Sequence, residues 1–272
     1  MQGSRQAGPD RVFDAHLHII DPRFPLQENN GYLPPTFTVG DYERRVADLG
    51  ILGGAVVSGS FQGFDQNYLT AALTALGPTF VGVTQIPIET TDHEILRLDS
   101  VGVRAVRFNV RRGGSASLSD LDRLARRVHD LAGWHSEIYI DSRELRPILP
   151  TLVKLPALGI DHLGLSADGF PDLLNLVESG AFVKATGFGR VELDIADAMN
   201  RILDVNPGAL VFGTDLPSTR APRPFADTDL TSLHDLIAPE HLANVLWRNA
   251  ARLYRLEPSA EPPKAASDAE CG

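Results

Sequence analysis

The chain has 272 residues, of which 43% are hydrophobic and 22% are charged, and its formal net charge at pH 7 is −10. The length suits one α/β barrel of about 250 residues or two smaller domains, and the composition predicts a sizeable core. The acidic balance argues against a general nucleic-acid binder or a protein of anionic membrane surfaces, because phosphates would be repelled without a concentrated basic face. It does not exclude a small anion held in a local basic pocket.

The sequence shows neither a membrane-spanning segment nor a signal peptide, and this suggests the cellular compartment. No apolar run approaches the roughly 20 residues of a membrane span, and residues 1–11 have no apolar core of a signal peptide. Cys271 is the single cysteine, so no intramolecular disulfide can form and a reducing compartment is the simplest setting. We therefore expect a cytoplasmic protein with neither a membrane nor a nucleic-acid partner; the sequence sets no oligomeric state.

Residues 1–11, rich in Gly, Gln and Pro, are expected to be flexible, and the first strand follows at residues 12–18. Side chains two apart share a face of a strand, so His16 and His18 should point the same way as Asp14. The alternate residues should form the opposite, apolar face, and these are Phe13, Ala15 and Leu17. This strand is expected to bring two imidazoles to one point.

Beyond the first strand, residues 21–40 are rich in Pro, Asn and Gly, which suits a loop over a barrel mouth, and Asp41 offers a helix N-cap. Short apolar strands then alternate with amphipathic helices, the clearest with apolar residues at i, i+3 and i+4 over 118–131. Further strands are expected at 53–57, 80–84, 103–109, 137–141, 159–165, 182–186 and 209–214, and further helices at 42–49, 65–76, 92–100, 170–178 and 194–205.

About eight strands alternating with helices predict parallel strands joined by helical crossovers. Closure into a single-domain (β/α)8 TIM barrel over residues 12–256 is the economical arrangement, and a doubly wound open sheet is the alternative. Residues 257–272 are rich in Pro, Ala and Glu without apolar periodicity, and a disordered tail is expected there.

Barrel enzymes carry their chemistry at the C-terminal ends of the strands, and the polar candidates lie there. The first strand supplies His16 and His18, the sixth His162 and the eighth Asp215. Strands four, five and seven add Arg107 with Arg111 and Arg112 just beyond it, Tyr139 with Asp141, and Arg190. Singly, each has a structural explanation in capping or solvation, but their joint placement points to a site.

This set permits addition of water to an acyl carbon. Asp215 could take a proton from water while the imidazoles polarise a carbonyl or orient the water. Arginine forks suit carboxylates, so the pocket would be locally basic. His16, His18 and Asp215 are also a ligand set for one divalent ion such as Zn²⁺.

Other polar features are expected to have no catalytic role. Gly113-Gly114 has no Lys and Ser or Thr at the offsets of a phosphate loop, and no serine lies in a G-x-S-x-G setting. The remaining histidines are expected in helices or loops with exposed or capping roles, namely His93, His129, His135, His234 and His241.

Over about residues 12–256 the chain resembles the amidohydrolase superfamily, in the branch of the 2-pyrone-4,6-dicarboxylate and sugar-acid lactonases. Five segments carry the resemblance: Asp14-Ala15-His16-Leu17-His18, the strand Gly102 to Asn109, Asp161-His162-Leu163-Gly164, Gly213-Thr214-Asp215-Leu216-Pro217, and Arg248 to Tyr254. Two positions depart from the branch, because Leu216 stands where a Trp is common and Ser218 where a His is common. These departures concern the substrate more than the reaction type.

The resemblance implies roles for individual residues. Asp215 would be the general acid/base beside the three histidines His16, His18 and His162. Arg107, Tyr139 and Arg190 would hold substrate carboxylates or line the pocket, with a further arginine at Arg111 or Arg112, of which we take Arg112.

The resemblance also implies the reaction. The expected activity is opening of the ring ester of a carboxylated lactone, with no obligatory cofactor, since strand five offers Tyr139 where metal-dependent members have His or a modified Lys. The alternative is a mononuclear zinc-dependent amidohydrolase or decarboxylase of the same superfamily. A third reading, from another class, is a barrel that binds an acidic small molecule without catalysis.

Overall fold

The structure, a computed structural model, describes residues 11–256. The flexible N-terminus expected over residues 1–10 and the tail expected over 257–272 lie outside the described residues. Arg11, which the sequence analysis assigns to the flexible segment, is described, and its guanidinium carbon lies 4.3 Å from the centroid of the Trp247 ring.

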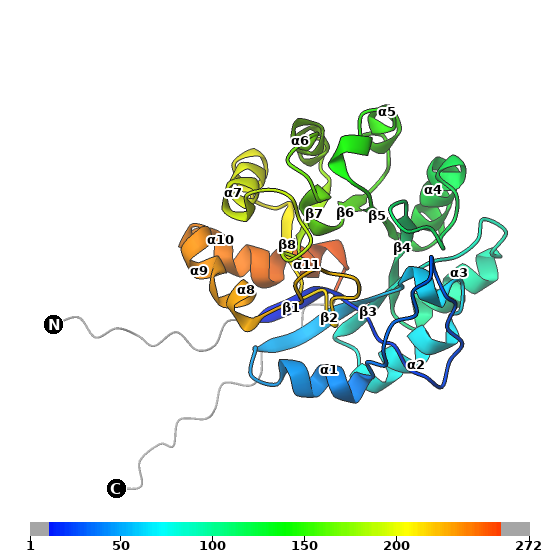
Figure 1. Ribbon diagram of the computed structural model, residues 1–272. Coiled ribbons are helices and arrows are strands. Elements are labelled where there is room, and N and C mark those ends of the chain that lie inside the picture. The colour runs from blue at the N-terminus through cyan, green and yellow to red at the C-terminus, as the bar shows by residue number, and fades with distance from the viewer. Residues whose placement is uncertain (1–10, 257–272) are drawn as a thin grey trace, which may run out of the picture.

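Eight parallel strands form one sheet in chain order, and the helices surround it, which confirms the single-domain (β/α)8 barrel (Figure 1). Each strand pairs in parallel with the next along the chain. The strands are β1 (Val12–Leu17), β2 (Ile51–Val57), β3 (Phe80–Thr84), β4 (Val103–Asn109), β5 (His135–Tyr139), β6 (Leu158–Ile160), β7 (Phe182–Ala185) and β8 (Leu210–Phe212).

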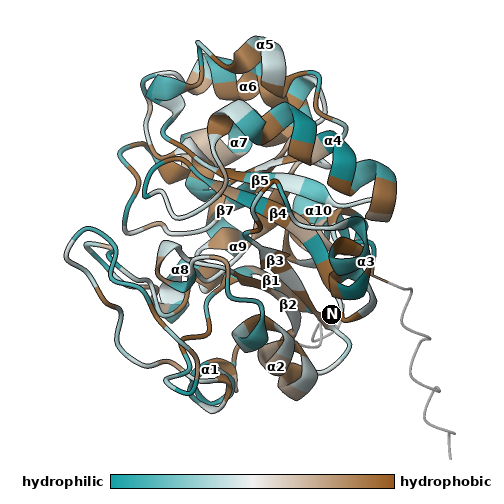
Figure 2. Cartoon of the chain, turned by 90° about the vertical axis from the view of Figure 1, so that its right-hand side faces the viewer, coloured by the Kyte–Doolittle hydropathy of each residue, from teal (hydrophilic) through white to brown (hydrophobic). Residues whose placement is uncertain are grey.

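The helices pack an apolar side on the strands, and Figure 2 shows hydrophobic residues concentrated on the strands and on one side of helices such as α4. Between the strands lie α1 (Val39–Val46), α2 (Asn67–Leu76), α3 (Asp92–Ser100), α4 (Leu121–Ala132), α5 (Leu149–Leu152), α6 (Phe170–Glu178) and α7 (Ile195–Val205). After β8 come α8 (Asp227–Thr231), α9 (Leu233–Leu236), α10 (Pro239–Ala243) and α11 (Asn249–Leu253). No helix within residues 11–256 is long and apolar enough to cross a membrane.

The start of α1 differs from the prediction. Thr38, not Asp41, is the N-cap, because the Thr38 hydroxyl accepts from the Asp41 backbone N–H at 3.3 Å while the Asp41 carboxylate accepts from the Thr38 backbone N–H at 2.8 Å. This reciprocal capping box begins the helix three residues earlier than expected.

The faces predicted for β1 are wrong for Asp14 and Leu17, whereas His16 and His18 reach the same point as predicted. Phe13 and Ala15 pack with residues of β2, β3, β4 and β8 in the barrel interior, whereas Leu17 packs in the outer core with the helices. Asp14 turns to α1, where its Oδ2 accepts from the Tyr42 hydroxyl at 3.0 Å. The pairing of β1 with β2 shifts register between Asp14 and Leu17, and this irregularity breaks the two-residue alternation.

The sixth and fifth strands also differ from the prediction. β6 ends at Ile160, and a turn with left-handed backbone at His162 (φ 53°) and Leu163 (φ 52°) follows. β5 begins two residues earlier than expected and includes His135, which is buried. His135 is therefore a strand residue in the core and not, as predicted, an exposed or capping one.

The junction of β8 with β1 closes the barrel through the segment that follows β8. The Asp215 backbone N–H donates to the carbonyl oxygen of His16 at 2.7 Å, and the His18 N–H donates to that of Leu216 at 2.7 Å. Asp14 accepts from the backbone N–H of Thr214 at 2.8 Å and from its hydroxyl at 2.6 Å. The closure therefore places the segment after β8 directly against the histidine pair of β1.

Candidate active site

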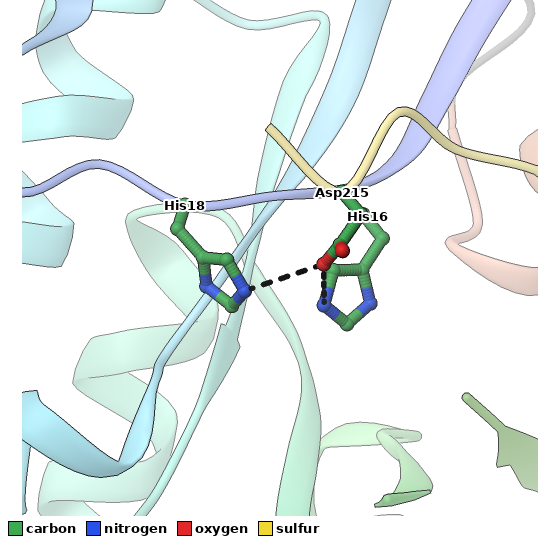
Figure 3. A group of neighbouring side chains, drawn as sticks. All are labelled: His16, His18 and Asp215. Carbon is green, nitrogen blue, oxygen red and sulfur yellow. Dashed lines mark ion pairs between the residues drawn. The ribbon is translucent and has the colours of Figure 1, made fainter. Parts of the chain in front are cut away.

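Three imidazoles and one carboxylate meet at the C-terminal end of the barrel. The Nε2 atoms of His16, His18 and His162 lie 3.8, 3.9 and 4.0 Å from Oδ1 of Asp215. All four residues are buried, and Figure 3 shows the rings of His16 and His18 both joined by dashed lines to one oxygen of the Asp215 carboxylate. The structure thus brings together the four residues that the sequence singled out as catalytic candidates.

An unusual backbone conformation at two of these residues directs their side chains toward the cluster of imidazoles and carboxylate. Asp215 has φ 62° and His162 has φ 53°, a left-handed conformation that costs a non-glycine residue on the order of 1–3 kcal/mol. Hydrogen bonds hold both turns, from the Asp215 N–H to His16 and from the Leu165 N–H to the carbonyl oxygen of His162 at 2.9 Å. Such strain is characteristic of functional sites.

His18 presents a lone pair to the centre. Its Nδ1 lies 2.7 Å from the carbonyl oxygen of Val57, which can only accept, so Nδ1 carries the proton. Burial, together with the charges of His16 and Arg107, holds the pKa of His18 well below its ordinary value of 6.5. The ring is therefore neutral at pH 7, and Nε2 is an acceptor facing Asp215.

His16 is oriented by an aspartate that the sequence analysis did not assign a role. Nδ1 of His16 lies 3.3 Å from Oδ1 of Asp161, the residue that follows β6. Burial alone would raise the pKa of Asp161, but Arg107, His16 and Lys184 hold it well below 3.8, so the carboxylate is ionised. Arg107 donates to Oδ2 of Asp161 from Nη2 at 2.8 Å.

The two oxygens of Asp215 have different surroundings. Oδ2 accepts from Arg190, whose Nε lies at 3.0 Å, with a second bond from Nη2. Nη1 of Arg190 also reaches the hydroxyl of Tyr139 at 3.5 Å. Oδ1 is buried and has no hydrogen-bond partner within residues 11–256, so it is the oxygen left free toward the imidazoles.

A small pocket lies above this centre, and its empty volume is about 360 Å³ with the open solvent at its mouth included. Its cationic lining consists of Arg107, Arg112, Arg190 and Arg220. Arg111 is exposed and does not line the pocket, so Arg112 is the arginine of that pair that faces it.

For two further polar residues, the structure differs from what the sequence predicted. Arg220 was missed, although its place five residues after Asp215, past the end of strand eight, was a usable signal. Asp141 is buried outside the pocket, where Oδ2 accepts from Nη2 of Arg143 at 2.8 Å and the side chain caps a short turn, so it takes no part in the site.

A second group of buried charges lies among the strands and was also missed. Nζ of Lys184 lies 2.5 Å from Oε2 of Glu137 and 3.5 Å from Oδ1 of Asp161. Oε1 of Glu137 accepts from the Tyr254 hydroxyl at 2.7 Å and lies 3.1 Å from Nε2 of His135. The charge of Lys184 between the apolar residues Val183 and Ala185 was the available signal.

The residues at the centre fit a divalent metal ion. Oxygen and nitrogen atoms of His16, His18 and Asp215 lie close enough to share one ion, and so do those of His16, Asp161 and His162. Within residues 11–256 neither Nε2 of His16 nor Oδ1 of Asp215 has a hydrogen-bond partner, and Nε2 of His18 carries a lone pair. Two imidazoles and a carboxylate are a donor set of catalytic zinc sites.

The barrel, the histidine pair of β1 and the aspartate after β8 are together the features of a barrel hydrolase. Residues 13–256 match the family model described as Amidohydrolase, and the chain belongs to that family.

Named relatives lie within this family. The chain is 26% identical over 275 residues to a 4-sulfomuconolactone hydrolase of Hydrogenophaga intermedia, covering 90% of this chain and 89% of that protein. It is 29% identical over 187 residues to a 2-pyrone-4,6-dicarboxylate hydrolase of Comamonas testosteroni, covering 67% of this chain and 59% of that protein.

Solved structures agree on the architecture. A crystal structure of an Agrobacterium tumefaciens protein superposes with a TM-score of 0.82 at 25% identity, covering 93% of this chain and 98% of that one. A probable 2-pyrone-4,6-dicarboxylic acid hydrolase from Acinetobacter baumannii superposes with a TM-score of 0.80 at 21% identity, covering 90% and 99%.

Proposed function

We propose that this protein hydrolyses the ring ester of a small lactone that carries acidic groups, without an obligatory metal. One observation carries the proposal: a buried carboxylate oxygen, Oδ1 of Asp215, is free of protein hydrogen bonds within residues 11–256 and faces three imidazoles beneath an arginine-lined pocket. The names of the relatives, hydrolases of 4-sulfomuconolactone and of 2-pyrone-4,6-dicarboxylate, support this substrate class.

In this mechanism Asp215 is the general base. A water molecule between Oδ1 of Asp215 and the imidazoles gives one proton to Oδ1 and its other hydrogen bond to the lone pair on Nε2 of His18. The water oxygen adds to the acyl carbon of the lactone, and Arg190, by holding Oδ2, keeps Oδ1 aimed at the proton. The ring C–O bond then breaks, and its oxygen takes the proton back from Asp215.

The arginines bind the substrate in this proposal. Arg107, Arg112 and Arg190 present guanidinium groups to the pocket, and Tyr139 lines it beside His162, their ring centroids 4.9 Å apart. Arg107 and Arg190 already use Nε and Nη2 on Asp161 and Asp215, so in this proposal Arg112 offers the planar fork that pairs with a carboxylate through two parallel hydrogen bonds. A neutral lactone should therefore bind much more weakly than its acidic counterpart.

A metal-dependent hydrolase is the second candidate, because His16, His18 and Asp215 fit a divalent ion in ligand type and in lone-pair direction. Held by these three residues, zinc would polarise the carbonyl and lower the pKa of a bound water. We favour the metal-free reaction because Arg190 and Arg107 already neutralise Asp215 and Asp161, which removes the negative charge that would favour a dication.

Asp215→Asn tests the base directly. Hydrolysis of 2-pyrone-4,6-dicarboxylate and of 4-sulfomuconolactone is followed by loss of the ring absorbance and by acid release. We expect kcat to fall by about 10²- to 10⁴-fold, since the amide cannot take a proton. Equal thermal denaturation midpoints of the two proteins confirm that the variant is folded, and a fully active variant refutes the proposal.

Metal removal separates the two candidates. The protein is dialysed against a chelator, its metal content is measured, and kcat is determined before and after addition of Zn²⁺. We expect hydrolysis to survive chelation unchanged. Stoichiometric zinc in the active protein, with activity lost on its removal and restored on its return, establishes the metal-dependent reaction instead.

A further inference from the structure

Four buried side chains of alternating charge follow one another inside the barrel, and we call them the charged row. They are Arg107 of β4, Asp161 after β6, Lys184 of β7 and Glu137 of β5, and none is more than 3% exposed. Nη2 of Arg107 lies 2.8 Å from Oδ2 of Asp161, and Nζ of Lys184 lies 3.5 Å from Oδ1 of Asp161 and 2.5 Å from Oε2 of Glu137. Each buried charge therefore has a partner of opposite sign. Of the four, only Arg107 lines the pocket, and the mechanism makes no use of Lys184.

The two oxygens of Asp161 are held in different ways. Oδ2 accepts from both Nε and Nη2 of Arg107, at 3.2 and 2.8 Å, although a planar guanidinium fork pairs best with a carboxylate through both of its oxygens. Oδ1 has no hydrogen-bond partner within residues 11–256 and lies 3.3 Å from Nδ1 of His16 and 3.5 Å from Nζ of Lys184. Charge therefore keeps Oδ1 beside His16, and Lys184 supplies the positive charge at that oxygen.

The other end of the charged row holds Lys184 in place. Oε2 of Glu137 faces Nζ of Lys184, while Oε1 of Glu137 accepts from the hydroxyl of Tyr254 at 2.7 Å. The same hydroxyl donates to the carbonyl oxygen of Ala15, the residue before His16, at 3.1 Å. Glu137 is thus tied to β1 through Tyr254. The ammonium group of Lys184 therefore lies between two carboxylates that each have a further partner.

We propose that Lys184 is a positioning residue for the reaction. Its ammonium group holds Oδ1 of Asp161 beside Nδ1 of His16, which keeps the proton on Nδ1 and the lone pair of Nε2 on the side of Asp215. Without this cation the carboxylate turns until both of its oxygens face the guanidinium fork of Arg107, which draws Oδ1 away from the imidazole. The proposal rests on the proposed function and adds to it a residue that contacts neither the pocket nor the reacting atoms.

The double variant Glu137→Gln/Lys184→Met tests this role, because it removes the ammonium group without leaving an unpaired carboxylate at residue 137. Nitrogen-15 NMR of the His16 ring, in protein dialysed against a chelator and with signals assigned from His16→Gln, reports which nitrogen carries the proton. We expect the proton on Nδ1 in the wild type and, in the double variant, a shift of both ring nitrogens toward the values of a tautomer mixture. With 2-pyrone-4,6-dicarboxylate as substrate, kcat should fall about 10- to 100-fold with KM little changed, because a catalytic group is misplaced.

Two further variants serve as comparisons. Asp172→Asn/Arg146→Met also removes one carboxylate and one cation, but from a salt bridge of 2.7 Å whose arginine is exposed, and it should leave the NMR signals and kcat near wild type. Glu137→Gln alone keeps the ammonium group of Lys184, so its effect on both measurements should be much smaller than that of the double variant. An equal effect assigns the role to Glu137 and overturns the proposal.

The tautomer of His16 decides the proposal independently of the reaction. A wild-type protein with the proton on Nε2 of His16 overturns it without any variant, and so does an unchanged tautomer in the folded double variant. A kinetic effect confined to KM, or a loss of thermal stability with kcat unchanged, also overturns it while lactone hydrolysis stands. If the wild-type protein opens none of the rings, the proposed function fails, and the NMR comparison still shows whether Lys184 positions His16.

Discussion

At the scale of single residues, the site depends on Asp161, whose carboxylate positions other side chains, as much as on Asp215, the proposed base. Asp161 is ionised, accepts from Arg107 through Oδ2 and lies 3.3 Å from Nδ1 of His16 through Oδ1. The contact lacks hydrogen-bond geometry, but the negative charge beside Nδ1 favours the tautomer with the proton on that nitrogen, so Nε2 of His16 faces Asp215 as an acceptor. Asp161 therefore acts through His16 as a positioning residue.

Asp161→Asn should expose this role. An amide at this position can donate to Nδ1 and favour the opposite tautomer, so we expect kcat to fall on the order of 10²- to 10⁴-fold, as for other histidines that lose their orienting carboxylate. Asp141→Asn, a buried aspartate that pairs with Arg143 outside the pocket, is the control and should keep near wild-type kcat. A merely structural role would lower the denaturation midpoint of Asp161→Asn without changing kcat of the folded protein.

At the scale of elements, the junction of β1 with the segment after β8 decides the geometry of the site. Gly213 lies where a Cβ atom would be 2.7 Å from the backbone nitrogen of His16 and 3.1 Å from its Cβ. Because the nearest atom is backbone, the strands would have to separate to make room. The absence of a side chain at this position lets Asp215 and the two histidines of β1 approach each other.

Gly213→Ala should therefore impair catalysis. We expect kcat/KM to fall by at least about tenfold, since a displacement near 1 Å of reacting groups is costly, with a loss of stability of about 1–3 kcal/mol from overpacking. Kinetics and urea denaturation measure the two effects. In the control Gly40→Ala, whose Cβ would lie 3.4 Å from the flexible end of Arg44 and 4.0 Å from Oγ1 of Thr38, activity should be retained and α1 slightly stabilised. Unchanged kinetics in Gly213→Ala would show that the junction can relax.

At the scale of the whole molecule, the buried ion pair of Glu137 and Lys184 links β5 with β7, two strands of the barrel wall that are separated by β6. Burial by itself would raise the pKa of Glu137, but Lys184 and His135 lower it from 4.5 to about 2. A carboxylate whose pKa is lower in the folded than in the unfolded state contributes stability that is fully present above about pH 4.5 and is lost as the pH falls toward 2. The ion pair should therefore steepen acid unfolding.

The double variant Glu137→Gln/Lys184→Met tests this linkage. Its free energy of unfolding should depend less steeply on pH between about 5 and 3 than that of the wild type, as measured by urea denaturation at several pH values. Lys184→Met alone leaves a buried carboxylate without its cation and should cost about 3–5 kcal/mol at pH 7. An equal pH slope in the double variant and the wild type would contradict a linkage through Glu137.

The sequence by itself determined the alternation of strands and helices, and with it the barrel and the strand ends at which His16, His18, His162 and Asp215 converge, because hydrophobic periodicity and strand order are local properties of the chain. Only the tertiary structure decided which face each side chain of β1 takes, since the register shift beside β2 depends on a neighbouring strand. It also decided the partners of Asp161, the burial of His135 and the place of Arg220, because each is bonded to or packed against residues far away in the chain. The pattern of residues along one strand does not show which contacts that strand makes with distant strands of the barrel.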